Sequence, residues 1–345
     1  MKHIIGGNEV APLPQVKTVV VDEDCAGQRL DNFLLRQLKG VPKTHVYRII
    51  RSGEVRVNKG RVSADSRLQP GDTVRLPPLR TSQRAEEKTH AMAANAARGA
   101  PPRAFSVLLE DEHLLAIDKP AGLAVHGGSG VSFGVIEQLR MARPQARFLE
   151  LVHRLDRDTS GILLIAKKRS ALKHLQDQFR ERETGKTYLA MVAGRWPANK
   201  KVLDKPLHKY LLADGERRVR VVARDDPDGM PSVTLVKVQQ RLAAGDRLGG
   251  EFSLLEVTLK TGRTHQIRVH LASEAHPILG DDKYGDFELN KALLRSDQAP
   301  ALKRMFLHAW RLQFNHPVSA ERIELTTPLP TELEAFLTHA ASLAP

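Results

Sequence analysis

Hydrophobic positions between residues 18 and 80 change from helical spacing to alternation along the chain. Apolar residues recur every three or four positions over 30–38 and again over 46–50, with a Gly-Val-Pro turn between the two stretches. Valines then alternate with polar residues at 55–57, and a similar short run at 74–76 follows a Pro-Gly-Asp turn. The pattern predicts a small unit of two helices followed by strands, with one apolar side and one basic side.

This regularity is lost in residues 81–104, which are rich in alanine, proline and polar residues and contain almost no large apolar side chain. A segment of this composition buries little surface, so we expect a flexible linker there. We also expect residues 1–17 to form an N-terminal tail. The chain is thereby divided into a first domain at 18–80 and a larger domain at 105–340.

Short apolar runs and amphipathic segments follow one another through the larger domain. The apolar runs predict strands at 114–118, 151–152, 162–166, 186–192, 219–222, 232–238, 252–260 and 323–326. Helical spacing predicts helices at 134–141, 170–182 and 264–273. Because several of the predicted strands are joined by short turns, we expect an α+β fold whose mixed sheet is mainly antiparallel and is flanked by helices.

Positive charge is concentrated in the first domain. The 345-residue chain has 53 Lys and Arg residues against 40 Asp and Glu residues, a formal net charge of +13. Nine of these cations but only two acidic residues fall within 29–61, so this segment alone carries +7. A dense patch of one sign favours a polyanionic partner, above all a nucleic acid, over an ordinary solvated surface.

Membrane and secreted proteins have features that this sequence lacks. Its longest aliphatic run, 162–166, is far shorter than the ~20 residues that cross a bilayer, so we expect no membrane partner. The N-terminal residues lack the apolar core of a secretory signal, and the single cysteine, Cys25, cannot form an internal disulfide. We therefore expect a cytoplasmic protein.

A cluster of ionisable side chains lies between two of the predicted strands. His153, Arg154, Asp156, Arg157 and Asp158 occupy five of six consecutive positions. A polar loop held by buried strands is a common way to fix reactive groups. The arginines beside Asp156 favour its ionised carboxylate, which can act as a nucleophile, a base or a counter-ion. A purely structural ion-pair loop has the same composition, so the cluster alone does not distinguish a reactive site from a structural loop.

The first domain resembles the S4 RNA-binding module. The resemblance lies in the segments QRLDNFLLRQL (28–38), KTHVYRIIRSGEVRVNKGRV (43–62) and LQPGDTVRL (68–76). It implies the small α-L fold, in which two helices and the following strand present a basic surface to structured RNA. By this resemblance, the residues that face RNA are Lys43, Tyr47, Arg48, Arg51, Arg56 and Lys59.

The larger domain resembles the RluA-type pseudouridine synthases. The segment HRLDRDTSG (153–161) matches the signature of that family, and further matches follow in the family's order. These are DKPAGLAVHGG (118–128), KTYLAMVAG (186–194), TGRTHQIRVHL (261–271), HPILGDDKYG (276–285) and FLHAWRLQFNHP (306–317). Six ordered matches behind an S4-like domain indicate the family far more strongly than one match.

The second resemblance implies roles for five residues. Asp156 matches the catalytic aspartate, Tyr188 the aromatic residue that stacks on the target uracil, and Arg268 the arginine that pairs with the catalytic carboxylate. Leu307 matches an apolar residue of the base pocket, and Arg154 the residue that fills the gap left by the flipped base. The family reaction changes no oxidation state and transfers no external group, so we expect no cofactor.

The remaining polar motifs are weaker. His265 and His270 are five positions apart without a metal-binding motif, and we expect no metal site. The pair Asp281-Asp282 is expected to form a structural turn. Helical spacing in the HQIR segment places His265 and Arg268 on one face.

The two resemblances imply an isomerase that converts selected uridines of large-subunit (23S) ribosomal RNA, or of its assembly intermediate, to pseudouridine. The target base has to be flipped out of stacked RNA before it can react. We expect a monomer whose S4-like domain docks on folded RNA. The alternatives are a non-catalytic RNA-binding or ribosome-assembly factor, and a sister synthase with another rRNA or tRNA target. Attack on the sugar, attack on the base and elimination through a glycal all remain open.

Overall fold

The computed structural model describes residues 16–22, 25–38, 41–78, 104–127, 133–213, 215–245, 250–295 and 301–342. The chain forms two compact units, Met1–Pro101 and Pro102–Pro345. Residues 1–15 of the expected tail and 81–103 of the expected linker lie outside the described residues. Within the described ranges, no helix is long and apolar enough to cross a membrane.

The first unit is a three-stranded antiparallel sheet packed against two helices. In chain order its elements are β1 (Lys17–Val20), α1 (Leu30–Gln37), α2 (Lys43–Arg51), β2 (Arg56–Val57) and β3 (Thr73–Leu76). The sheet order is β1-β3-β2. Leu34 of α1, Ile49 of α2 and Val74 of β3 are buried in one core. The predicted helices and the strands that follow them are confirmed, while β1 is an additional strand.

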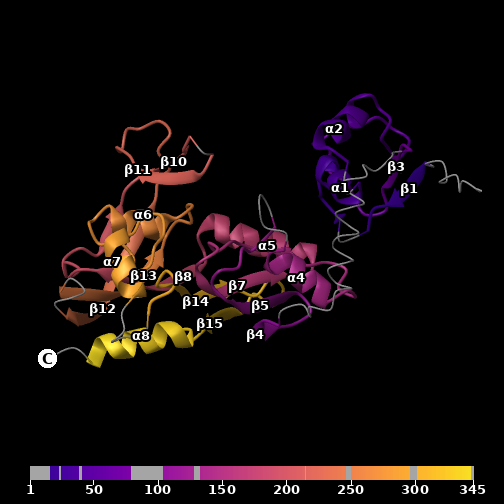
Figure 1. Cartoon of the computed structure of the whole chain (residues 1–345). Coiled ribbons are helices and arrows are strands. Elements are labelled where there is room, and N and C mark those ends of the chain that lie inside the picture. Colours follow the sequence, from indigo (N-terminus) through magenta and orange to yellow (C-terminus); the bar gives the residue numbers. More distant parts are fainter. Residues whose placement is uncertain are drawn as a thin grey trace, which may run out of the picture. The chain divides into compact units, whose positions relative to one another are not determined.

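A large mixed sheet forms the centre of the second unit (Figure 1). Its main strands, in spatial order, are β4 (Ser106–Glu110), β5 (Leu114–Lys119), β7 (Ser160–Ala166), β14 (Leu307–Asn315), β8 (Gly185–Ala193), β13 (Gly250–Leu259), β12 (Val233–Gly245) and β9 (Val202–Asp204). In addition, β6 (Glu150–Leu151) pairs with β7, and β15 (Arg322–Thr326) pairs with β14. A separate two-stranded sheet consists of β10 (Leu207–Leu211) and β11 (Arg217–Val221).

Helices cover both faces of the large sheet. They are α4 (Val135–Ala142), α5 (Arg169–Glu181), α6 (Gln266–Ala272), α7 (Phe287–Leu294) and α8 (Thr331–Ser342). Successive side chains of a strand point to opposite faces. Leu114 of β5 packs with Leu175 of α5, whereas the next residue, Leu115, packs with Leu139 of α4. The two helices therefore lie on opposite faces, which explains the unbroken apolar runs 114–117 in β5 and 162–166 in β7.

The contact between β7 and β14 is the one parallel pairing among the described strand pairs, so the sheet is mainly antiparallel as predicted. It depends on Gly161, which has a φ of +112°. A Cβ atom added there would lie 2.3 Å from the carbonyl oxygen of Ala309. Only glycine tolerates both the backbone angle and this approach. The close contact brings the start of β14 next to the loop that precedes β7.

Every predicted strand of the larger domain overlaps an observed strand, and all three predicted helices exist. One boundary was wrong in a way that matters. The helix expected over 264–273 begins at Gln266, and His265 is its N-cap residue with a left-handed φ of 52°. His265 and Arg268 therefore do not share a helical face, because His265 lies before the first turn of the helix.

Candidate active site

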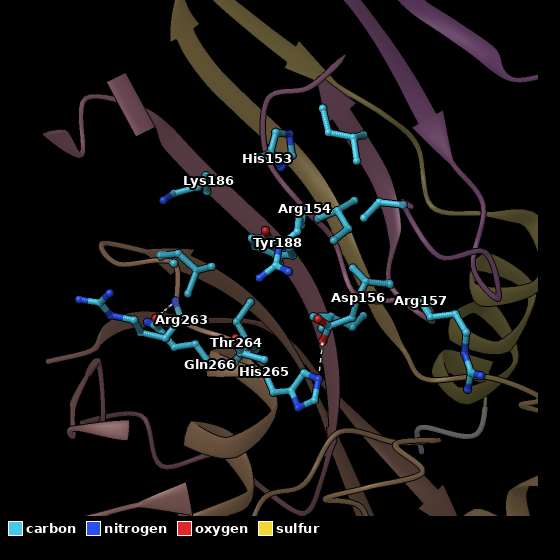
Figure 2. A pocket seen from close by; sticks show the side chains of 18 of the residues that line it. His153, Arg154, Asp156, Arg157, Lys186, Tyr188, Arg263, Thr264, His265 and Gln266 are labelled. Carbon is cyan, nitrogen blue, oxygen red and sulfur yellow. Dashed lines mark hydrogen bonds and ion pairs between the residues drawn. The ribbon is translucent and has the colours of Figure 1, made fainter. Parts of the chain in front are cut away.

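A cavity of about 740 Å³ lies between the loop that precedes β7, strand β8 and the start of α6. Its size is typical of small-molecule sites in proteins. The lining includes all five residues to which the resemblance assigned a role: Arg154, Asp156, Tyr188, Arg268 and Leu307. Figure 2 labels the first three of them. Asp156 is the one carboxylate among the described residues that line this cavity, and several of the others are cationic.

The backbone of the Asp156 loop is fixed from beneath by buried groups. The Thr159 amide donates a hydrogen bond to the Asp156 carbonyl oxygen at 3.2 Å, which closes a turn. Lys119 is fully buried, and its ammonium group donates to the Arg157 carbonyl oxygen at 3.0 Å. Burial, together with the nearby Arg304 charge, lowers the pKa of Lys119 to about 7. Arg304 itself donates to the Asp158 carbonyl oxygen at 3.3 Å.

Arg268 is the cation that reaches the Asp156 carboxylate. Its Nη1 atom lies 3.3 Å from Asp156 Oδ2, and only 4% of its side chain is exposed. The rest of the guanidinium is gripped by Asp281, with Nε and Nη2 each 2.7 Å from one of its carboxylate oxygens. Burial opposes the charge of Arg268, but Asp281 and Asp156 outweigh it and raise the pKa of the guanidinium. Its orientation is therefore set before any substrate arrives.

Asp281 was expected only as part of a turn, and the structure gives it a second role. It is fully buried, and its Oδ1 atom accepts hydrogen bonds from the amides of Lys283 and Tyr284 at 2.8 and 3.0 Å. Burial acts to raise the pKa of Asp281, but the Arg268 charge and these amides lower it overall. The turn thus holds a carboxylate in place for Arg268. The DDKYG segment was the available signal in the sequence.

The arginines next to Asp156 in sequence do not contact its carboxylate. Arg157 bonds to the neighbouring Asp158, with Nη2 3.2 Å from Oδ2, and points away from Asp156 (Figure 2). Arg154 is exposed at the cavity wall. The expectation that these two side chains would support the Asp156 charge was wrong, because adjacent loop residues project in different directions. The cation that contacts the Asp156 carboxylate is instead Arg268, which lies 112 residues further along the sequence.

Tyr188 and Leu307 supply the apolar part of the cavity. Tyr188 lies on β8 and Leu307 at the start of β14, next to β8 in the sheet. Burial, with the Asp156 charge, raises the pKa of the Tyr188 hydroxyl, so the phenol stays neutral. Leu307 is buried, with 3% of its surface exposed. A flat ring and an aliphatic side chain that flank one carboxylate can hold a planar base.

His153 stabilises the loop rather than the reacting centre. Its ring stacks on Phe179, with the ring centroids 4.8 Å apart. Its Nε2 atom accepts the backbone N–H of Leu164 at 3.1 Å, which requires an unprotonated nitrogen. Burial, with the charge of Lys186, lowers the pKa of His153 to about 4. The neutral imidazole is therefore a structural link between the Asp156 loop and β7.

The RNA-facing residues expected in the first unit lie mainly along one side of α2. Lys43, Tyr47 and Arg51 are four positions apart and exposed, as is Arg48, whereas the opposite side of the helix is buried in the core. Lys59 is also exposed, while Arg56 is half-buried. The Tyr47 hydroxyl donates to the buried Asp31 at 3.0 Å, so this residue also stabilises the fold.

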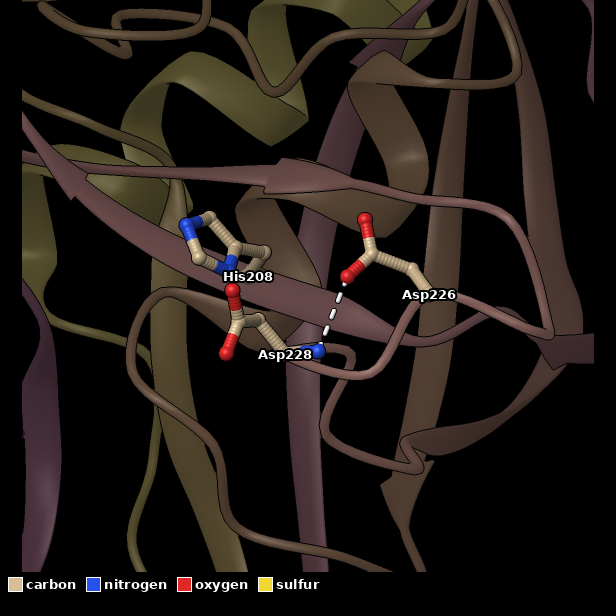
Figure 3. A group of neighbouring side chains, drawn as sticks. All are labelled: His208, Asp226 and Asp228. Atoms are coloured by element: carbon tan, nitrogen blue, oxygen red, sulfur yellow. Dashed lines mark hydrogen bonds between the residues drawn. The ribbon is translucent and has the colours of Figure 1, made fainter.

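One further polar group lies outside this cavity. His208 of β10, with Asp226 and Asp228 from the loop after β11, places one possible metal-ligand atom from each side chain within 4.8 Å of the others (Figure 3). The Asp226 carboxylate already accepts the Asp228 amide at 2.9 Å, as in an ordinary turn. These residues do not line the cavity, so we assign them no part in its chemistry.

Comparison with known proteins gives matches in both units of this chain. Residues 113–273 match the family described as RNA pseudouridylate synthase, and residues 28–74 match the S4 domain family. The ribosomal large subunit pseudouridine synthase C of Salmonella typhimurium is 50% identical over 324 residues, which cover 94% of this chain and 96% of that protein. The Escherichia coli K12 protein of the same name is 49% identical, with the same coverage.

Solved structures agree with the sequence matches. Human RNA pseudouridylate synthase domain containing 4 is 26% identical and superposes with a TM-score of 0.54, covering 74% of this chain and 97% of that one. Human RNA pseudouridylate synthase domain containing 1 has the same fold, with a TM-score of 0.55 at 24% identity over 71% of this chain and 97% of that one. With the cavity around Asp156 and the full-length relatives, these matches show that the chain belongs to the RNA pseudouridylate synthase family and carries an N-terminal S4 domain.

Proposed function

We propose that this pseudouridine synthase acts on uridines of large-subunit ribosomal RNA, or of its assembly intermediate, and that Asp156 is its catalytic residue. The observation that carries the proposal is the pairing of Asp156 Oδ2 with Arg268 Nη1 at 3.3 Å, in a cavity that also contains Tyr188 and Leu307. The RNA class is supported by the names of the relatives that match this chain over nearly their whole length.

The reaction needs a carboxylate close to the glycosidic bond. The N1–C1′ bond breaks, the base turns, and a C5–C1′ bond forms, while C5 loses a proton and N1 gains one. Asp156 can attack the sugar or the base, or can assist elimination to a glycal. In each route Arg268 holds the carboxylate in a fixed direction, because Asp281 fixes the guanidinium from the other side.

The other cavity residues suit a base that has left the RNA stack. Tyr188 supplies a ring on which the uracil can stack while it is detached, and Leu307 closes the apolar side. Arg154 is exposed at the wall, where its guanidinium can fill the gap in the RNA. Extruding a nucleotide costs a few kcal/mol, least at unpaired positions, so we expect the target uridines in loops or bulges.

The S4 domain supplies affinity for RNA in this proposal. The exposed cations of α2, Lys43, Arg48 and Arg51, offer phosphate contacts, and Arg56 and Lys59 extend the same basic segment. Exposed Tyr47 adds a ring that can stack on an unpaired base. We further propose that the protein acts as a monomer in the cytoplasm, where large subunits are assembled.

Mapping of pseudouridine in total RNA from a strain without the gene tests the proposal. We expect specific sites in large-subunit rRNA to lose pseudouridine, the wild-type protein to restore them, and Asp156→Ala to leave them unmodified. If Asp156→Ala restored the sites, Asp156 would not be the catalytic residue. If sites were lost only in tRNA or small-subunit rRNA, the assigned RNA class would be wrong.

A further inference from the structure

His265 lies between Asp156 and Tyr284, and its two ring nitrogens face different partners. Nε2 is 3.9 Å from Asp156 Oδ2, and Nδ1 is 2.9 Å from the Tyr284 hydroxyl. The side chain is 14% exposed, and burial lowers its pKa, so the ring is neutral at pH 7. A neutral imidazole carries a proton on only one of its two ring nitrogens. The position of that proton determines whether Nε2 presents an N–H donor or a lone pair to the Asp156 carboxylate.

The hydrogen bonds around Tyr284 fix the direction of its hydroxyl. The backbone N–H of Val219 donates to the hydroxyl oxygen at 3.0 Å, so the phenolic hydrogen needs an acceptor elsewhere. In the part of the chain that the structure describes, His265 Nδ1 is the acceptor within reach. Burial raises the pKa of Tyr284, so the phenol retains its hydrogen. Nδ1 therefore accepts, and the imidazole proton resides on Nε2.

The position of Asp156 favours the same tautomer. An Nε2–H group points a donor at the carboxylate, whereas an unprotonated Nε2 would turn a lone pair toward a negative charge. The separation of 3.9 Å is longer than a hydrogen bond, and such contacts often tighten when substrate binds. Tyr284 also packs on the other support of Asp156, because the Arg268 guanidinium lies 5.2 Å from the centre of its ring.

We propose that Tyr284 is a positioning residue of the isomerisation, because its hydroxyl fixes His265 in the Nε2–H tautomer and so gives Asp156 a second donor. His265 and Arg268 then face the same oxygen, Oδ2. The described residues donate no hydrogen bond to Oδ1, which is left to the reacting uridine. This inference rests on the proposed function, since it assumes that Asp156 reacts.

Tyr284→Phe tests the inference because it removes the hydroxyl and keeps the ring beneath Arg268. In the full-length protein we expect the single-turnover rate on bound rRNA to fall roughly tenfold, the effect of losing one hydrogen bond, with unchanged affinity for RNA. Tyr210→Phe is the matched control, because it removes a hydroxyl from β10, outside the cavity lining. It should leave both quantities unchanged.

The tautomer can be read without any activity measurement. In histidine-labelled ¹⁵N wild-type protein, the His265 signal, assigned by its loss in His265→Gln, should show a protonated Nε2 and an unprotonated Nδ1. In Tyr284→Phe it should show a mixture of tautomers. His265→Gln keeps an N–H donor and should retain more activity than His265→Leu.

Several results would overturn the inference. One is a wild-type His265 protonated on Nδ1, which is decisive even if Tyr284→Phe does not fold. Another is a Tyr284→Phe protein with the wild-type rate, and a third is equal activity of the Gln and Leu variants. A wild-type protein that formed no pseudouridine in rRNA while His265 had the expected tautomer would instead contradict the proposed function.

Discussion

Helix α2 of the S4 domain and the cavity of the larger unit both contain basic residues, but those of α2 are exposed and Arg268 of the cavity is buried. The α2 cations Lys43, Arg48 and Arg51 are exposed along one side of the helix. Arg268 is 4% exposed, and carboxylates occupy its guanidinium on both sides. An exposed cation is free to meet phosphate, whereas a buried one is committed to a protein partner. The comparison predicts that binding and turnover can be changed separately.

Arg268→Lys should cause a large loss in the rate of pseudouridine formation. Lysine keeps the charge but lacks the planar fork that grips Asp281 while it reaches Asp156. A displacement of ~1 Å in a catalytic group can cost about a hundredfold in rate, so we expect a loss of that order with near-normal RNA affinity. Single-turnover rates at saturating enzyme and binding constants for the same RNA separate the two effects. Weakened binding with a near-normal rate would make Arg268 an RNA-binding residue.

Acid should lower the stability of the larger unit through His153, which lines the cavity. The pKa of His153 is about 4 in the fold against an ordinary 6.5. The unfolded chain therefore takes up the proton first, so the stability present above pH 6.5 is lost progressively as the pH falls toward 4. At pH 5 the loss is about 2 kcal/mol in the free energy of unfolding.

Chemical unfolding at pH 7 and pH 5 measures this loss. The control is His153→Gln, which has no titrating group but can still accept the Leu164 amide. Its stability should depend less on pH over this range. An equal loss in both proteins would mean that other groups control the acid response.

Replacing Lys43, Arg48 and Arg51 together by alanine should weaken RNA binding about tenfold at low salt. Each phosphate contact that is lost should also reduce the slope of log affinity against log salt by about 0.7–0.9. The rate of pseudouridine formation on RNA that is already bound should stay normal, because these residues belong to the first unit and not to the cavity. Binding titrations at several salt concentrations measure both quantities. An unchanged salt slope would remove α2 from the RNA-binding surface.

Tyr47→Phe should have the smallest effect. It removes the hydrogen bond to the buried Asp31 but keeps the exposed ring. We expect the first unit to lose about 1 kcal/mol of stability and the affinity for RNA to change little. Thermal unfolding and RNA titration are sufficient to check this. A large loss of affinity without a loss of stability would mean that the hydroxyl itself contacts RNA.

The sequence could predict elements whose hydrophobic pattern is regular. The strands around the Asp156 loop and helix α5 are of this kind. Strand β14 was not among the predicted strands, although it lies in the middle of the sheet. It contains the buried His308, whose ring nitrogens lie 2.9 Å from Ser160 Oγ and 3.2 Å from the Thr327 carbonyl oxygen. A polar residue satisfied by distant partners hides the apolar alternation on which such a prediction depends.

The site was predictable in its residue types but not in its contacts. The resemblance selected Asp156 and Arg268, which the structure places within reach of one another. It did not select Asp281, Tyr284 or Lys119, since their partners lie in other motifs of the sequence. Local charge was misleading for Arg157, which bonds to its neighbour Asp158. Pairings between distant loops are set by the fold, and residue spacing does not report them.

Asp156→Asn gives the most direct test of the account, because asparagine has nearly the same shape but lacks the negative charge. Pseudouridine formation should be measured in a single turnover with the target rRNA fully bound. We expect the variant to fold and to bind RNA like the wild type, and to form no pseudouridine. Formation above a few per cent of the wild-type rate would contradict the assignment of Asp156 as the reacting carboxylate.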